Sequence, residues 1–309
     1  MNNSREITKH EGISVIICSI NESLCQSVQK NITQTIGVEF EIIVRENTTD
    51  SKGLSQVYNE CAKEAKYPYL CFVHEDVIIH TENWGNILIN DVQNQLTGVI
   101  GVAGTQSLSK HPYSWWSVDP SSNKINLIQR GKDGQMLNWK NNNLPALSEV
   151  LVLDGVFLFL KKSIWEEIQF DEINFPFFHY YDIDFTFAIS GKYSNFVSSR
   201  ILIEHLSIGK LNDDWFSAAF RFVEKWKLDL PRSLKSSPPL KSKNTKKKNI
   251  GYIRLMVLST TWNIGTLYKK SKILDKENHS PILSLILILY FSVYKRLLRT
   301  YHLLRKLNN

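Results

Sequence analysis

The chain has 309 residues, which is enough for one α/β domain of ordinary to large size and an additional segment. Hydrophobic residues make up 43% of it, which is typical of a globular protein and excludes a largely disordered chain. Residues 232–309 carry 17 basic and two acidic side chains (+15), whereas residues 1–231 carry 20 and 28 (−8). The tail would attract anionic lipid or nucleic acid, but the acidic body argues against specific nucleic-acid binding.

The cysteines and the first residues indicate a reducing compartment. The four cysteines form no CxxC pair and no zinc-binding spacing. Cys18 and Cys71 lie inside apolar runs, which is typical of reduced cysteines in a core. Residues 1–12 are polar, so we expect no secretory signal there and a cytoplasmic protein.

Three expected strands alternate with two helical patterns near the start of the chain. The strands are 13–18, 41–47 and a third that begins at 69 and ends at 74–76, and the helices are 22–35 and 54–66. This order with short connections predicts a parallel sheet with right-handed crossovers. The residues that follow the three strands then lie along one sheet edge, where open α/β sheets bind ligands.

The third strand ends abruptly on His74, Glu75 and Asp76. Two adjacent carboxylates are too costly to bury without partners, so they do not belong to the core. Hard divalent cations prefer oxygen ligands and can carry a substrate's phosphates, which makes a metal site one interpretation. A solvated loop, or a cap for the next helix, is the alternative.

The middle of the chain continues the alternation and then changes character. A helix is expected near 82–96 and a strand at 98–104, whereas 105–148 reads as an irregular insertion that contains a hairpin. Its Trp115, Trp116 and Trp139 suit sugar binding by stacking, although ordinary packing is as good an explanation for any single tryptophan.

The next elements carry more acidic and imidazole groups. Asp154-Gly155 interrupts an apolar strand pair over 149–160, and a short helix begins at 162. Asp182 and Asp184 open a helix that runs to about 190. A last strand, 196–205, ends on His205, and an aromatic-rich helix is expected at 213–226.

The C-terminal part is predicted to be separate. We expect a domain over 1–230, a Ser/Pro/Lys linker over 231–249 and a basic helical tail over 250–309. The apolar run 281–294 is shorter than the roughly 20 residues that a spanning helix needs. Its basic flanks suit a helix that lies in the interface of an anionic membrane, and packing on the body or on a partner is the alternative.

Several of these segments, in this order and spacing, resemble the family 2-like GT-A glycosyltransferases, which use nucleotide-sugars. The resemblance covers roughly residues 13–226, and it is carried by 14–21, 53–59, 72–76, 153–155 and 179–184. It implies an α/β GT-A fold with a Rossmann-like, mostly parallel sheet flanked by helices, followed here by a C-terminal helical appendage. The chain departs from the family where His74-Glu75-Asp76 replaces the usual Asp-x-Asp.

The resemblance also implies a role for individual residues. It assigns Asp76 and His205 to a divalent metal, Mn²⁺ or Mg²⁺; a satisfied structural histidine is the alternative for His205. The residues that it assigns to the nucleotide-sugar donor are Ser19, Asn21, Glu46, Asn47, Asn59, His74, Glu75 and Asp76.

On the acceptor side, the resemblance places Asp182 as the general base of an inverting transfer, with Asp184 in a supporting catalytic position. A purely structural explanation is that both acids favour the start of their helix through its dipole. Asp154 and Gly155 would contact a glycan or lipid-linked acceptor, and the tail would hold the enzyme at the cytoplasmic membrane face. The alternatives are an inactive or carbohydrate-binding GT-A protein and, remotely, a nucleic-acid binder through the tail.

Overall fold

The computed structural model describes residues 11–49, 52–131, 134–141, 143–207, 209, 211–237, 245–275 and 281–307. Its contacts divide the chain into two units. The first holds residues 1–108, 115–209 and 231–238, and the second holds 109–114, 210–230 and 239–309. The 213–225 helix, expected with the first domain, therefore groups with the C-terminal helices, and 231–238 groups with the first unit.

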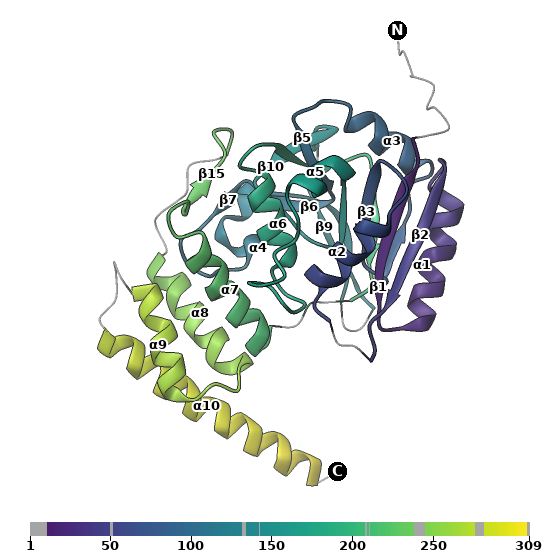
Figure 1. The fold of residues 1–309 in the computed structure, drawn as a ribbon. Helices are drawn as coiled ribbons and strands as arrows, with labels where there is room; N and C mark the ends of the chain where they lie inside the picture. Colours follow the sequence, from purple (N-terminus) through teal and green to yellow (C-terminus); the bar gives the residue numbers. More distant parts are fainter. Residues whose placement is uncertain are drawn as a thin grey trace. The chain divides into compact units, whose positions relative to one another are not determined.

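A seven-stranded sheet forms the centre of the first unit (Figure 1), in the order β10-β13-β5-β12-β3-β1-β2. Its strands are β1 (Ile13–Ser19), β2 (Phe40–Glu46), β3 (Tyr69–Val73), β5 (Thr97–Gly101), β10 (Leu147–Val150), β12 (Phe157–Lys161) and β13 (Ser194–Ser198). Strands β1, β2 and β3 pair in parallel, as do β5 and β13, whereas β12 is antiparallel to both of its neighbours. The pair β10–β13 is also antiparallel.

The sheet is therefore mixed: β1, β2, β3, β5 and β13 run in one direction and β10 and β12 run against them, so the expected mostly parallel sheet is confirmed with two antiparallel strands. The reason lies in how the chain enters β12. Phe157 pairs with Val73, and the amide of His74 donates to the carbonyl of Val156 at 3.2 Å. Strand β12 thus starts beside the end of β3 and must run back along it.

A second sheet has the order β11-β6-β8-β14-β4, with β9 added on β8. Its strands are β4 (Val77–Ile79), β6 (Ala103–Thr105), β8 (Asn123–Arg130), β9 (Met136–Lys140), β11 (Val152–Leu153) and β14 (Ile203–His205). The predicted hairpin in the insertion is confirmed as β8–β9. A small ladder of β7 (Ser107–Leu108) with β15 (Arg232–Ser233) completes the strands of the described residues.

The single strand that the sequence predicted over 196–205 is in fact two strands in different sheets, β13 and β14. Asn126 of β8 holds the crossing between them. Its side-chain amide donates to the carbonyls of Ser199 at 3.0 Å and Ile201 at 2.8 Å. The apolar pattern continues through the crossing because Ile201 is fully buried there.

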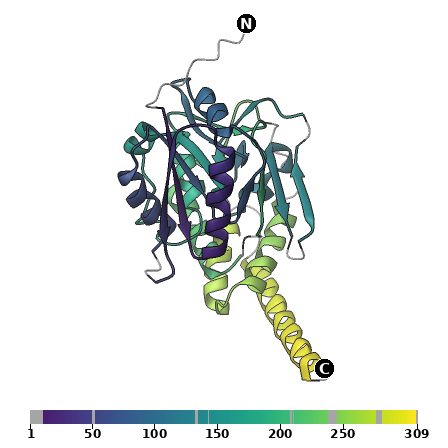
Figure 2. The same cartoon turned by 90° about the vertical axis from the view of Figure 1, so that its right-hand side faces the viewer.

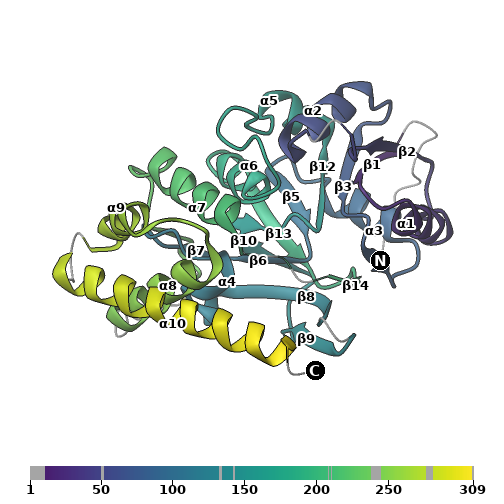
Figure 3. The ribbon, with the colours of Figure 1, turned by 90° about the horizontal axis from the view of Figure 1, so that it is seen from below.

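Helices cover both faces of the seven-stranded sheet. On one face the core is formed with α2 (Leu54–Glu64), α5 (Lys162–Glu167) and α6 (Tyr181–Ile189), which lie on the same side in Figure 3. Leu158 and Leu160 of β12 point into this core, whereas Phe157 packs edge-on against Trp84 on the other side, as the alternation of a strand requires.

The opposite face carries α1 (Glu22–Thr35), seen in front of the strands in Figure 2, and α3 (Trp84–Asp91). Helix α1 begins where the sequence predicted, because the Asn21 side chain caps it by accepting from the Leu24 amide at 3.1 Å. The insertion adds α4 (Trp115–Val118) and a 3₁₀ turn, Pro120–Ser122.

The second unit is helical. It contains α7 (Asp213–Lys225), α8 (Thr245–Ser259), α9 (Ile264–Asp275) and α10 (Pro281–Leu307). Aromatic side chains form its core, with Phe216 packing edge-on against Tyr252 at 5.4 Å between ring centroids. In the described part of the chain, no helix has the length and continuous hydrophobicity needed to cross a bilayer.

Candidate active site

The two sheets meet at the end of β3, and this junction brings His74, Asp76 and His205 together. After Val73 the chain leaves the first sheet and enters the second as β4 at Val77. Strand β14 runs antiparallel to β4, with His205 opposite Val77, and the Leu206 amide donates to the Asp76 carbonyl at 2.9 Å. This pairing places the last residue of β14 beside the first residues after β3.

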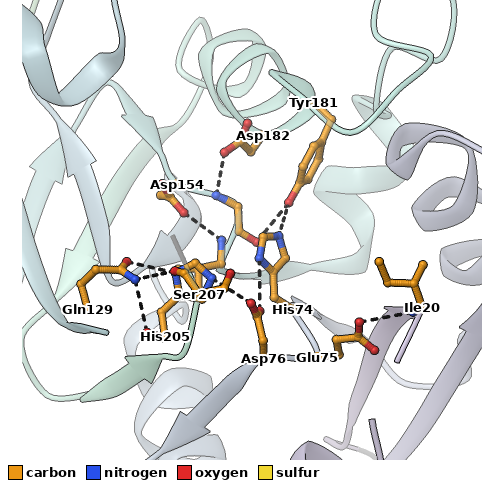
Figure 4. A network of polar contacts seen from close by, with 12 residues as sticks. Ile20, His74, Glu75, Asp76, Gln129, Asp154, Tyr181, Asp182, His205 and Ser207 are labelled. Atoms are coloured by element: carbon orange, nitrogen blue, oxygen red, sulfur yellow. Dashed lines mark hydrogen bonds and ion pairs between the residues drawn. The ribbon is translucent and has the colours of Figure 1, made fainter. Parts of the chain in front are cut away.

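His74, Asp76 and His205 form what we call the metal group (Figure 4). One ligand atom from each lies within 4.8 Å of the others, and all three side chains are half-buried. His74 Nδ1 is 3.9 Å from Asp76 Oδ1, and His205 Nε2 is 3.4 Å from Asp76 Oδ2. Atoms at these separations can share one divalent ion.

The charge balance of the metal group keeps its carboxylate ionised. Burial would raise the pKa of Asp76, but hydrogen bonding and charge from His205, together with His74 and Ser207, hold it well below its usual value. Burial and the neighbouring His205 lower the pKa of His74, which favours its neutral form. A neutral imidazole and an ionised carboxylate are the forms that bind metals.

Each histidine of the metal group has a polar partner on its other ring nitrogen. His74 Nε2 lies 2.8 Å from the Tyr181 hydroxyl, which also donates to the Gly155 carbonyl at 3.2 Å. His205 Nδ1 lies 3.1 Å from Oε1 of Gln129, its register partner on β8. The sequence prediction assigned neither partner. Gln129 lies far from His205 in the sequence, and only the pairing of β8 with β14 brings the two side chains together.

A second group of acids, the carboxylate pair Asp154 and Asp182, lies next to the metal group in Figure 4. Asp154 accepts from the Trp115 indole at 3.2 Å and from the Val156 amide at 3.1 Å. Asp182 accepts from the Gly155 amide at 2.7 Å. Trp115 of the insertion thus contacts the site through its indole, and the Gly155 backbone joins the two acids.

The carboxylate pair has a strongly shifted acid. Burial and the negative charge of Asp154 raise the pKa of Asp182 to about 7. Backbone amides at the start of α6 and at Gly155 oppose this shift, but they do not outweigh it. A carboxylate with a pKa near 7 is suited to accept a proton at neutral pH.

Glu75 makes its contacts within the protein rather than in the metal group. Its carboxylate accepts from the Ser19 hydroxyl at 2.7 Å, the Asn21 amide at 3.1 Å and the Ile20 amide at 3.3 Å. This clamp fixes the turn between β1 and α1. Ser19, Asn21 and Glu75, three of the predicted donor residues, are therefore brought together at the end of β1.

The remaining predicted residues lie in different surroundings. Glu46 is exposed at the end of β2, opposite Ser19, and Asn47 folds the following loop by bonding the backbone of Lys52 in both directions. Asn59 is 2% exposed, and its amide bonds Trp165 and the backbone of Phe170, so the structure does not bring it into this site. Asp184 is also 2% exposed, within α6.

The arrangement is that of an α/β enzyme in which a metal group and a carboxylate pair share one end of a mixed sheet. Residues 14–207 match the glycosyltransferase-like family, so the chain belongs to that family. This agrees with the predicted class of enzyme, and the two sheets with their helices agree with the predicted α/β fold class. No curated protein sequence matches the chain significantly.

Among solved structures, similarity is found to GalNAc-T7 with UDP, GalNAc and Mn²⁺, with 11% identity and a TM-score of 0.48 over 86% of this chain and 54% of that one. It is also found to a mannosyltransferase from Pyrobaculum calidifontis in complex with GDP-Man and Mn²⁺, with 11% identity and a TM-score of 0.42 over 90% and 69%. The chain thus spans about half the length of the first of these proteins.

Proposed function

We propose that this protein transfers a sugar from a nucleotide-diphosphate donor to an acceptor hydroxyl, with inversion at the anomeric carbon. The single observation that carries the proposal is the metal group lying beside a carboxylate whose pKa is about 7. Family membership supports the reaction class. Together they supply a place for the diphosphate and a base for the acceptor.

His74, Asp76 and His205 would hold the divalent ion, which supplies Lewis-acid stabilisation of charge that develops on the departing diphosphate. Two imidazole ligands and one carboxylate favour Mn²⁺ over Mg²⁺, because Mg²⁺ prefers oxygen. The turn between β1 and α1, clamped by Glu75, lies at the neighbouring strand end and would bind the nucleoside.

Asp182 is the proposed general base. It takes the proton of the acceptor hydroxyl as that oxygen forms its bond to the anomeric carbon, while the bond from that carbon to the donor phosphate oxygen breaks. The nucleoside diphosphate leaves with the bonding electrons. Asp154, with Trp115 bound to its carboxylate, would orient a hydroxyl of the acceptor.

The test is to incubate the purified chain with UDP-, GDP- and CDP-sugars, with and without Mn²⁺, and to measure release of the nucleoside diphosphate. Mn²⁺-dependent turnover of one donor class is expected. If no donor is bound or turned over, the proposed reaction is refuted.

The acceptor and the location form a second part of the proposal, which concerns helix α10. Its Ser284, Ile288 and Phe291 are buried, and the Lys295 ammonium donates to the Val257 carbonyl at 2.8 Å. The opposite face exposes a stripe of large apolar side chains: Ile286 at 55%, Leu289 at 44%, Tyr290 at 64%, Val293 at 57% and Leu297 at 63%.

An exposed apolar stripe in a strongly basic segment has the chemistry of a helix that lies in an anionic membrane interface. We infer that the stripe holds the enzyme at the cytoplasmic membrane face, where a lipid-linked or polysaccharide acceptor is available.

Sedimentation with vesicles tests this location. The chain is expected to bind vesicles that contain phosphatidylglycerol and not pure phosphatidylcholine, and Val293→Ser with Leu297→Ser should weaken binding. Ile173→Ser, at a residue 90% exposed in the other unit, is the control. Equal sedimentation of all variants, or a concentration-dependent dimer in solution that the serine variants abolish, would overturn the membrane assignment.

A further inference from the structure

We infer that Gln129 and Tyr181 are positioning residues that hold the two histidines of the metal group in opposite tautomers. Gln129 would place the His205 proton on Nδ1, and Tyr181 would place the His74 proton on Nε2. Each ring then presents its remaining lone pair to the ion. The inference rests on the proposed metal site, but not on sugar transfer.

The amide nitrogen of Gln129 fixes the orientation of its side chain. Gln129 Nε2 donates to the carbonyls of His205 at 3.3 Å and Ser207 at 2.5 Å, and to that of Arg130 at 3.1 Å. Carbonyl oxygens only accept, so the NH₂ group must face them and Oε1 must face His205. Because Oε1 also only accepts, the ring nitrogen 3.1 Å away, Nδ1, must carry a proton.

The other nitrogen of His205, Nε2, is the one that faces Asp76 at 3.4 Å. With the proton held on Nδ1, Nε2 would be the nitrogen that holds a metal ion. Gln129 is itself firmly placed, since it is 8% exposed and pairs in register with His205 in the β8–β14 ladder. The backbone of the second sheet therefore sets the orientation of a ligand.

Tyr181 has the opposite effect on His74, because it places the ring proton on Nε2 and not on Nδ1. Its hydroxyl has one proton, and the Gly155 carbonyl at 3.2 Å can only accept it. The hydroxyl also shares a side-chain hydrogen bond with Tyr58. In the arrangement in which Tyr181 donates to the Gly155 carbonyl, its oxygen accepts from His74 Nε2 at 2.8 Å, and the lone pair of His74 is on Nδ1, toward Asp76. Tyr181 is 3% exposed and packs edge-on against Tyr58, so its ring cannot turn away freely.

Position 155 has room for this arrangement only as glycine. A Cβ added there would lie 2.1 Å from the Tyr181 hydroxyl and 2.9 Å from the Asp182 Cβ. The close approach of Tyr181 to the Gly155 backbone is thus built into the chain. Hydrogen-bonded partners of this kind fix the orientation of metal-bound imidazoles, and their loss costs metal affinity.

The test measures Mn²⁺ affinity directly, by titration with detection of free Mn²⁺ by electron paramagnetic resonance. Gln129→Met and Tyr181→Phe keep side-chain size but remove the hydrogen bond, and each is expected to weaken binding about 10- to 100-fold. Gln56→Met and Tyr193→Phe, whose polar groups bond Glu60 and Glu167 away from the metal group, are matched controls and should bind as the wild type does.

A second measurement does not depend on the variants. Ring-nitrogen NMR of the metal-free wild-type protein, labelled at histidine, should show His74 as the Nε2–H tautomer and a protonated Nδ1 on His205. Unchanged Mn²⁺ affinity in both variants, or His74 protonated on Nδ1, would overturn the inference. A wild type that binds Mn²⁺ and shows these tautomers but turns over no donor would instead refute only the proposed transfer.

Discussion

The metal group and the carboxylate pair lie at the same end of the first unit, yet they hold their acids in opposite states. Asp76 stands between two imidazoles and a hydroxyl, which keep its pKa well below the usual range. Asp182 stands beside another carboxylate, and with burial this raises its pKa to about 7. The neighbouring groups alone thus give two aspartates of one site different pKa values, which suit different chemical roles.

The role of each aspartate at the site follows from the partners that the fold supplies. The partners of Asp76 come from β14 and from the end of β3, whereas those of Asp182 come from the turn before β12. An ionised acid suits a metal ligand, and an acid that titrates near neutrality suits a proton acceptor. The following substitutions test this division, in order of decreasing expected effect.

Asp182→Asn should lower kcat by about 10²- to 10⁴-fold, because the amide cannot take the acceptor proton. Donor affinity should not change, since the metal group is untouched; nucleotide titration calorimetry measures it.

The variant should also be more stable than the wild type at pH 8. A folded-state pKa raised from 3.8 to about 7 costs stability as pH rises through this range, and asparagine lacks that cost. Equal turnover by the variant would remove Asp182 from the base position.

Asp76→Asn should abolish measurable Mn²⁺ binding and lower turnover by about 10²- to 10³-fold, equivalent to several kcal/mol of lost charge stabilisation. Treatment of the wild type with a chelator should have the same effect, and added Mn²⁺ should restore the wild type but not the variant. Asp229→Asn, at an exposed site in the other unit, is the control for the substitution itself. Tight Mn²⁺ binding by the variant would contradict the metal group.

Gly155→Ala changes both regions at once, because the added Cβ meets Tyr181 and Asp182. We expect a loss of about 1–3 kcal/mol in the free energy of unfolding, typical of overpacking, together with weaker Mn²⁺ binding. Urea unfolding measures the first effect. Gly209→Ala is the matched control, since a Cβ at that position meets nothing within 4 Å. Equal losses in the two variants would show that Gly155 has no special steric role.

Asp154→Asn tests whether the charge of Asp154 raises the pKa of Asp182. Removing the neighbouring negative charge lowers the pKa of Asp182, so the rise of kcat/KM with pH should move to lower pH by about one unit. In the wild type the rise should be centred near pH 7, since the base acts only when deprotonated. A pH profile measured from pH 5 to 9 with each protein decides the matter, and an unmoved profile would assign the rise to another group.

Local pattern determined much of this protein. The apolar runs and the Asn21 cap specified β1, α1, β2, α2 and β3, and the polar residues after each strand did meet at one edge, as the bond from Ser19 to Glu75 illustrates. Such features depend on neighbours within a few residues, so the sequence displays them directly. The resemblance carried by short motifs likewise led to the family.

Tertiary structure decided what depends on contacts between distant segments. The direction of β12 and the split of the last predicted strand depend on how the chain passes from one sheet to the other. The interior position of Asn59 depends on its bonds to Trp165 and Phe170, 106 and 111 residues further along the chain. The partnership of Gln129 with His205 arises only when β8 and β14 pair, 76 residues apart. No local periodicity encodes such a pairing, because hydrogen bonds between strands depend on the register and the relative direction of the two strands.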